Sequence, residues 1–249
     1  MNYEAYRKGL TQLDYVDSVY VELRDGIETD EIVAFFCIND KSLGPDSIES
    51  SKFAVWDSTV LRRSLMNALN AIKGTYFVYS DNKMSLFHVH NYPYQFKVFS
   101  LFNEIEYIHF IESLGRPCLS GRSAAPPKYP HLLPPYSVWH YKLDWSCKCR
   151  DIDYFEIREN KVKAILEVTG KLKNEEHLKR SINPMSPRCI FKRMSLQKKI
   201  LHELSNKLSI NAYFVIHTED LNVFYIFDYD FNNLNVYNKE EYTSWLNSL

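Results

Sequence analysis

The stretch that decides the fold is "CRDIDYFEIRENKVKAILEVTGKLK", which runs from Cys149 to Lys173. Two runs rich in β-branched and aromatic residues flank a polar stretch around Asn160, a pattern typical of an antiparallel hairpin that turns there. Pairing about Asn160 places Asp153 directly opposite Glu167, on the same side of the sheet. Two carboxylates that close repel each other, and burial beside apolar neighbours adds to the cost. A purely structural sheet would not favour this arrangement.

A divalent cation between the two carboxylates reverses the sign of their interaction. Hard ions such as Mg²⁺ or Mn²⁺ bind oxygen ligands and keep positions open for water and a phosphate. The same register pairs Asp151 with Thr169 and makes Asp151 a third candidate ligand. The alternative is a solvated strand face around Asp153, with Glu167 neutralised by Lys163, because alternating polar residues usually indicate exposure. A register shift of one residue would exchange the two faces.

The composition is typical of a globular protein with one large or two modest domains. The chain has 249 residues, of which 45% are hydrophobic and 15% aromatic, enough for a sizeable core. No stretch approaches the roughly 18 to 20 apolar residues of a membrane span, and five cysteines form no even disulfide framework. We therefore expect a soluble, reduced, cytoplasmic protein. Cys147 and Cys149 lack a second pair of ligands at a suitable spacing, so ordinary thiols are favoured over a zinc site.

A proline-rich segment divides the chain. Residues 116–135 hold six of the ten prolines, a composition that blocks helix interiors and central strands. The sequence thus predicts an N-terminal α+β domain of unknown role over residues 1–115, a linker over residues 116–135, and a second domain over residues 136–249.

The N-terminal domain shows strand and helix patterns but no recognisable catalytic motif. Strands, amphipathic helices and a hairpin turning at Asp81–Asn82 are predicted from their composition and periodicity. The strands are expected over residues 18–25 and 31–40, the helices over 57–74 and 103–115, and the hairpin over 74–91.

The C-terminal domain has the predicted order strand, strand, helix, strand, strand. The helix lies in "MSLQKKILHELSNKLS", with Ser195 as its N-cap and apolar residues on one stripe. The last two strands are expected over residues 211–217 and 222–228, around a turn at Glu219–Asp220. This order predicts an α+β fold with a mixed β-sheet flanked by helices.

The order of Asp153, Glu167, a helix that opens with Gln197 and a following strand resembles the PD-(D/E)XK nuclease superfamily, in particular its RecB-like branch. "DIDYFEIRENKVKAILEVT" resembles the central hairpin of that family and "LQKKIL" resembles its Gln-containing helix, so the resemblance covers roughly residues 135–235. It implies a restriction-endonuclease-like fold and hydrolysis of phosphodiester bonds, in DNA more than in RNA. It also implies that Asp153 and Glu167 bind Mg²⁺ or Mn²⁺ and that Gln197 orients the attacking water or the scissile phosphate. A homodimer is compatible with the resemblance, although no symmetric interface is recognisable in the sequence.

The sequence departs from the family at the catalytic lysine. The family pattern places Lys at position 169, where this chain has Thr169, a neutral hydroxyl. Lys171, if a bulge at Gly170 turns it inward, or Lys163 on the same strand could supply the missing cation. The departure also leaves open a catalytically inactive nuclease-fold module that binds nucleic acid or a protein partner. A third alternative is a protein unrelated to nucleic acid, in which the 18 Tyr and 15 Phe form core and interfaces.

A basic segment follows the hairpin. Residues 171–199 carry nine Lys or Arg against two Glu, a net charge of +7. Such a segment can neutralise several phosphates, and Pro184 and Pro187 indicate a loop rather than a regular element. A charge run can also be only a solvated loop, but the position beside Glu167 favours contact with nucleic acid. The candidate contact residues are Lys171, Lys173, Lys179, Arg180, Arg188, Lys192, Arg193 and Lys198.

Overall fold

The computed structural model describes residues 3–16, 19–24, 31–39, 75–79, 85–89, 96–101, 148–183, 185 and 189–249, with single positions at 65, 68, 69, 71, 72, 106, 109 and 113. The chain divides into two units by its internal contacts. One unit combines Met1–Asp17 with Ile152–Leu249, and the other contains Ser18–Asp151. Each unit has a six-stranded sheet of its own. No helix in the described ranges is long and apolar enough to cross a membrane.

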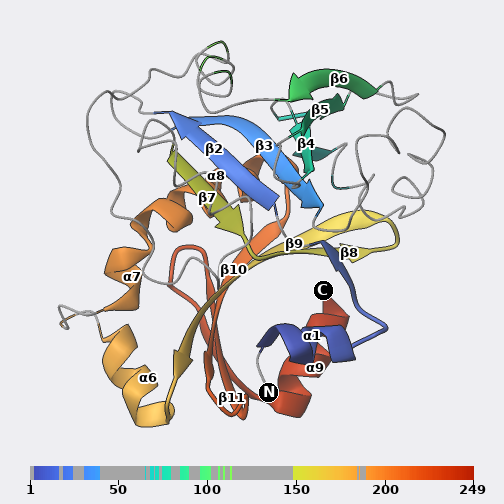
Figure 1. Ribbon diagram of the computed structural model, residues 1–249. Helices are drawn as coiled ribbons and strands as arrows, with labels where there is room; N and C mark the ends of the chain where they lie inside the picture. The colour runs from blue at the N-terminus through green and yellow to red at the C-terminus, as the bar shows by residue number, and fades with distance from the viewer. Residues whose placement is uncertain are drawn as a thin grey trace. The chain divides into compact units, whose positions relative to one another are not determined.

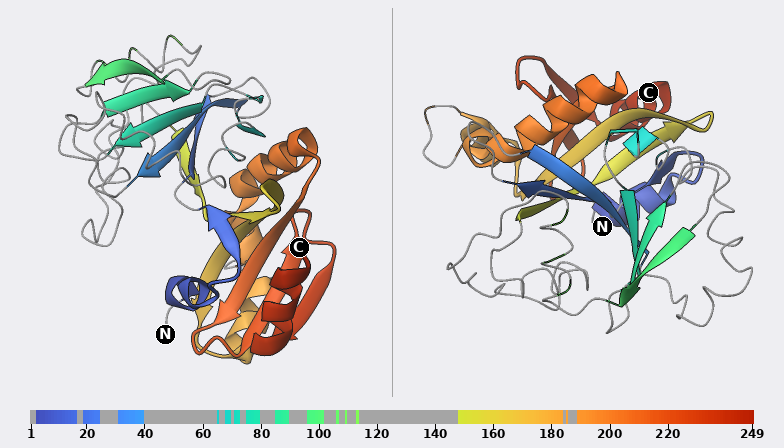
Figure 2. Two further views of the ribbon diagram at one scale, coloured as in Figure 1. Left: turned by 90° about the vertical axis from the view of Figure 1, so that its right-hand side faces the viewer. Right: turned by 90° about the horizontal axis from the view of Figure 1, so that it is seen from above.

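The unit of Ser18–Asp151 is built on a mixed sheet with strand order β6-β5-β4-β3-β2-β7, and Figure 2 shows strands of this sheet side by side. Its strands are β2 (Val19–Arg24), β3 (Glu31–Asn39), β4 (Thr75–Tyr79), β5 (Ser85–Val89), β6 (Phe96–Leu101) and β7 (Lys148–Ile152). The expected strands β2 and β3 and the expected hairpin of β4 and β5 are confirmed. The described positions 65, 68, 69, 106, 109 and 113 are helical, as expected. The predicted linker, residues 116–135, lies outside the described residues.

The other unit has a mixed sheet with strand order β1-β8-β9-β10-β11-β12. Its strands are β1 (Asp14–Val16), β8 (Tyr154–Arg158), β9 (Lys161–Leu172), β10 (Asn211–Thr218), β11 (Val223–Asp228) and β12 (Leu234–Asn238). β9 and β10 run parallel, and the other neighbouring strands run antiparallel. The predicted α+β class with a mixed sheet is therefore confirmed for this unit, as are the two predicted strands after the long helix.

The β8–β9 hairpin has nearly the predicted register. Phe155 pairs with Ile165, as a turn centred on Asn160 requires. The turn itself consists of Glu159 and Asn160, whose φ angles of 49° and 60° fit the two-residue turn that matches the twist of paired strands. A one-residue register shift after Glu156 reconciles this turn with the pairing further along the strands.

The first predicted strand of the hairpin is in fact two strands. β7 ends at Ile152 and pairs with β2, whereas β8 begins at Tyr154 and pairs with β9 and β1. Asp153 lies at the break, so Asp151 and Asp153 do not share a strand. The two strands also differ in their pairing partners, which lie in different sheets.

Three helices connect β9 to β10 and form a parallel crossover, which a parallel strand pair requires. They are α6 (Glu175–Ile182), α7 (Ile190–Arg193) and α8 (Ser195–Leu208). α8 confirms the predicted helix, and its residues Ile200, Leu201 and Leu204 are buried. Ser195 is not the N-cap, because Met194 caps α8 and its carbonyl accepts a hydrogen bond of 2.9 Å from the backbone N of Lys198.

The basic segment is largely helical rather than the loop that the sequence predicted. α6 and α7 occupy much of residues 171–199, and the Asn174 side chain accepts a hydrogen bond of 2.9 Å from the backbone N of His177 at the start of α6. The two prolines interrupt the segment between α6 and α7, so they separate two helices instead of preventing both.

The helices α1 (Tyr3–Gly9) and α9 (Lys239–Ser248) cover one face of this sheet. Figure 1 shows α1 and α9 on one side of β10 and β11, with α6 and α7 on the other side. Tyr3, Tyr6 and Tyr242 pack with Phe224 and Leu166 in one buried cluster. The beginning of the chain therefore belongs to the unit that contains the hairpin, which differs from the predicted domain of residues 1–115. The reason is that the apolar stripe of α1 is buried on the sheet.

Candidate functional site

Asp153 and Glu167 lie on neighbouring stretches of the hairpin. Asp153 precedes β8, and its Oδ2 accepts a hydrogen bond of 2.6 Å from the backbone N of Val168, the residue after Glu167. Tyr154 pairs with Leu166, so the same register extended by one residue places Asp153 opposite Glu167. Just before β8 begins, the Asp153 carboxylate thus accepts a hydrogen bond from β9 that a backbone carbonyl accepts in a regular strand pair.

Glu167 is a buried acid on the face of the sheet that α6, α7 and α8 cover. Its exposed fraction is 8%, and its partner in β10 is Phe214, which is fully buried. Ile165, two residues earlier on the same face, is also fully buried. A carboxylate in such surroundings needs compensating hydrogen bonds or charge. The alternative of a solvated strand face concerned Asp153, which is half-buried.

The predicted site residues Asp151 and Gln197 lie on other elements. Asp151 is exposed on β7 and belongs to the unit of Ser18–Asp151, whereas Asp153 and Glu167 belong to the other unit. Gln197 lies in the first turn of α8 and is half-buried. It stands on the helix that links the two parallel strands β9 and β10.

The strand around the expected lysine position is irregular. Val168 pairs with Val215, but Lys171 pairs with His217, so β9 advances three residues while β10 advances two. This places a bulge between Val168 and Lys171, at Thr169 and Gly170. It pairs Lys171 with His217, whose ring stacks on Tyr3 of α1, so the bulge puts position 171 on the α1 face of the sheet and not on the face of Glu167. Thr169 is half-buried, and the Lys171 side chain lies outside the described part of the structure.

The carboxylates of Asp153 and Glu167 are a small set of ligands for a hard divalent cation. Among the described residues, no three His, Cys, Asp or Glu side chains form a group that could hold a metal ion. Mg²⁺ in proteins commonly has one or two carboxylate ligands and completes its shell with waters and substrate phosphates. Asp153 and Glu167 are two such carboxylates, so the chemistry of the pair suits Mg²⁺ or Mn²⁺ bound together with a phosphate.

Part of the charge in the basic segment is compensated within α6. Lys179 Nζ lies 2.8 Å from Glu175 Oε1, and Arg180 pairs with Glu176 in the same i, i+4 geometry. The hydrogen bond and charge of Lys179 lower the pKa of Glu175. Exposed pairs of this kind are weak, so both cations stay available to phosphates.

The remaining predicted nucleic-acid contacts are distributed along the same connection. Lys173 and Lys192 are exposed, and Lys198 Nζ lies 3.1 Å from Asp230 Oδ1. Arg188 and the Arg193 side chain lie outside the described residues.

Sequence reasoning missed a buried ion pair on the opposite face of the hairpin. Arg7 of α1 and Glu156 of β8 are both fully buried, with 2.5 Å between Arg7 Nη2 and Glu156 Oε1. Burial alone would lower the pKa of Arg7, but Glu156 and nearby Tyr3 raise it above its usual value, so the guanidinium stays charged. The signal in the sequence was the helical spacing of Tyr3, Tyr6 and Arg7, which places all three on one face of α1.

Neither a protein-family model nor a curated protein matches this chain.

Proposed function

We propose that this chain is a divalent-metal-dependent nuclease that hydrolyses phosphodiester bonds, in DNA more than in RNA. The observation that carries the proposal is the position of Asp153 and Glu167. They lie opposite each other at the end of the β8–β9 pairing, and β9 leads through α6, α7 and α8 to the parallel strand β10. The order of carboxylate, carboxylate, Gln-containing helix and parallel strand supports the resemblance to PD-(D/E)XK nucleases.

Each residue has a defined role in this proposal. Asp153 and Glu167 hold Mg²⁺ or Mn²⁺, which lowers the pKa of bound water and offsets the charge on the phosphate. Gln197 orients the attacking water or the scissile phosphate from the first turn of α8.

The experiment is Mn²⁺ and Mg²⁺ titration calorimetry on wild type, Asp153→Asn and Glu167→Gln, with DNA cleavage measured in the same samples. Asp153→Asn keeps an oxygen that can accept from the Val168 amide, so it removes charge without removing that hydrogen bond. We expect both variants to lose metal affinity and cleavage together, by at least about tenfold, the lower end of what loss of a group supporting a metal ligand costs.

The matched control is Glu159→Gln, which neutralises an exposed carboxylate in the turn of the same hairpin. It should bind metal and cleave DNA as wild type does. Absence of metal binding by the wild-type chain, or cleavage that persists in Glu167→Gln, would refute the proposal.

A second candidate function is a nuclease-fold module that binds nucleic acid without cleaving it. The observation that favours it is Thr169, a neutral side chain at the family's lysine position, beside a bulge in β9. The variant Thr169→Lys distinguishes the two functions. Cleavage that arises only in Thr169→Lys supports the inactive module, whereas cleavage by wild type excludes it.

A further inference from the structure

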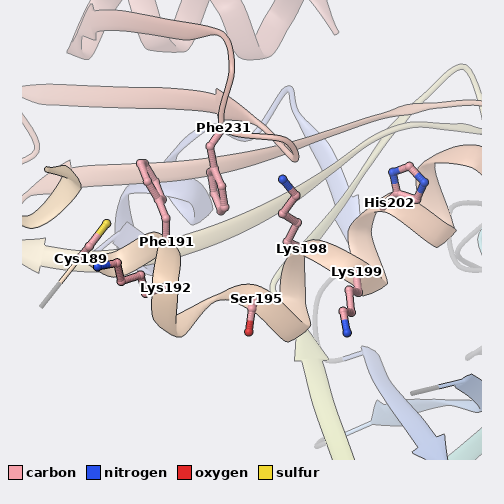
Figure 3. A pocket seen from close by; sticks show the side chains of 8 residues that line it. All are labelled: Cys189, Phe191, Lys192, Ser195, Lys198, Lys199, His202 and Phe231. Atoms are coloured by element: carbon pink, nitrogen blue, oxygen red, sulfur yellow. The ribbon is translucent and has the colours of Figure 1, made fainter. Parts of the chain in front are cut away.

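A pocket of about 470 Å³ lies between α7, the beginning of α8 and the loop that joins β11 to β12. Its walls include Phe191 of α7, Lys198 of α8 and Phe231 of the loop, as Figure 3 shows. The volume falls within the range of about 300 to 1,000 Å³ that is usual for small-ligand sites. Neither aromatic residue has a role in the proposed cleavage reaction.

The aromatic wall of the pocket continues toward the candidate site. The rings of Phe191 and Phe231 stack with centroids 4.1 Å apart and planes 24° apart. Phe231 also stacks on Phe214, with centroids 4.6 Å apart. Phe214 is the β10 partner of Glu167. A continuous column of aromatic rings therefore connects the strand position beside Glu167 with the pocket.

The loop holds Phe231 in an unusual conformation. Phe231 has a φ of 63°, a left-handed value that is rare for a bulky side chain. Asp228 fixes the loop: its backbone O accepts from Phe231 N at 2.9 Å and its Oδ1 accepts from Asn232 N at 2.9 Å. Its Oδ2 accepts from Asn233 Nδ2 at 2.7 Å. The ring is thus positioned by the fold before any ligand binds.

Positive charge surrounds the aromatic wall. Lys192, Lys198 and Lys199 line the pocket, and Lys192 and Lys199 are exposed. Lys198 Nζ lies 3.1 Å from Asp230 Oδ1 and 5.5 Å from the centroid of the Phe231 ring. Three lysines against Asp230 leave a net charge of +2 around an apolar cavity. This combination suits a ligand with a flat apolar part and a phosphate.

We infer that the pocket binds an unpaired nucleotide of a DNA strand, with its base or sugar against the Phe191 ring and its phosphates beside the lysines. The inference rests on the proposed nucleic-acid substrate and narrows it. In a duplex the base faces are stacked and cannot enter a pocket, whereas proteins that bind single strands combine aromatic platforms with basic grooves. The chain therefore prefers single-stranded DNA, or an unpaired end, over a closed duplex.

The test measures binding of fluorescein-labelled oligo(dT) of about 20 nucleotides, and of a duplex with the same number of phosphates, by anisotropy. The full chain is used with EDTA present so that no cleavage occurs. The Lys192→Ala/Lys199→Ala variant should lower the slope of log affinity against log salt for oligo(dT) by about 1.4, because each phosphate contact on a single strand contributes about 0.7. Phe191→Ala should weaken oligo(dT) binding about 5- to 150-fold, the effect of losing one stacked base.

Lys161→Ala/Lys207→Ala is the charge-matched control, since both lysines are exposed in the same unit and lie outside the pocket. Oligo(dT) preference that is lost in the pocket variants and kept in the control supports the inference. Equal affinity for oligo(dT) and duplex, or equal losses in the two lysine variants, overturns it. Cleavage is measured separately with Mn²⁺. Binding that depends on the pocket, without any cleavage, supports this inference and refutes the nuclease proposal. Cleavage without binding that depends on the pocket supports the nuclease proposal and refutes this inference.

Discussion

Removing either member of the buried Arg7–Glu156 ion pair should destabilise its unit, and the two losses should differ. Both side chains are fully buried, and loss of one partner from such a pair costs about 3 to 5 kcal/mol. Arg7→Met leaves Glu156 with the Arg158 guanidinium at 3.2 Å, so about 3 kcal/mol is expected. Glu156→Leu leaves Arg7 over the rings of Tyr15, at 4.8 Å, and Tyr154, at 5.4 Å. Aromatic faces compensate a buried charge less well than a carboxylate does, so about 5 kcal/mol is expected.

The double variant Arg7→Met/Glu156→Leu should recover most of the loss. Replacing a whole buried pair by apolar side chains of similar volume is often neutral or stabilising, so its stability should fall within about 2 kcal/mol of wild type. Urea unfolding gives the free energies, and amide hydrogen exchange in peptides of β8 to β10 reports this unit alone, because a chain of two units need not unfold in one step.

The control for this cycle is the exposed pair Lys8–Glu4 on the same helix. Lys8→Met should cost less than about 1 kcal/mol. If either core variant costs no more than this control, or if the double variant loses the sum of the single losses, the reasoning is wrong.

Three further changes test other parts of the same unit. Burial raises the pKa of Tyr3 and Tyr242 above the usual value of 10.0, and their hydroxyls lie 2.5 Å apart. A tyrosine whose pKa is higher in the folded state than in the unfolded state stabilises the fold less once the pH exceeds its unfolded-state pKa. The urea midpoint should therefore fall as the pH rises above that pKa, and it should fall less in Tyr3→Phe. The double variant Glu159→Asn/Asn160→Gly should raise stability by about 1 kcal/mol, because both positions have positive φ; an unchanged midpoint would contradict the assigned turn. Asn238→Ala should cost about 1 kcal/mol by removing the capping box of α9, while Asn238→Asp should keep most of it.

The long apolar elements could be predicted from the sequence because their composition and spacing record burial. The apolar stripe of α8 and the runs of β-branched and aromatic residues in β10 and β11 correspond to the observed elements. The register of the hairpin was also accessible, since a turn near Asn160 fixes which residues pair.

The break at Asp153 could not be predicted, because β7 and β8 differ only in their distant partners, β2 and β9. The place of α1 depends on equally distant contacts. No helix was predicted there, and the spacing of Tyr3 and Tyr6 does not show on which sheet such a helix packs. The bulge beside Thr169 is visible only in the pairing of β9 with β10.

α6 is a different case, because its signals were present in the sequence. Asn174 can cap a helix, and Glu175 and Glu176 stand four residues before Lys179 and Arg180, a spacing that stabilises helices. The prolines nearby favoured a loop, although a proline disturbs a helix only at its own position and in the turn before it, and α6 ends at Ile182, two residues before Pro184.

The hairpin carries one buried acid on each face, and the comparison shows why burial alone does not identify a metal ligand. Glu156 faces α1, where Arg7 and Arg158 compensate its charge within the fold, so it needs no cation from solution. Glu167 faces α6 to α8, opposite Asp153, a second carboxylate that adds negative charge at this position. Neutralising Glu156 should therefore lower the free energy of unfolding and leave Mn²⁺ affinity unaltered. Neutralising Glu167 should lower Mn²⁺ affinity and leave the free energy of unfolding unaltered. If Glu167→Gln instead destabilises the unit as strongly as loss of Glu156 and leaves Mn²⁺ affinity unchanged, both acids are structural, and the basic connection with its aromatic pocket carries the function without metal chemistry at this pair.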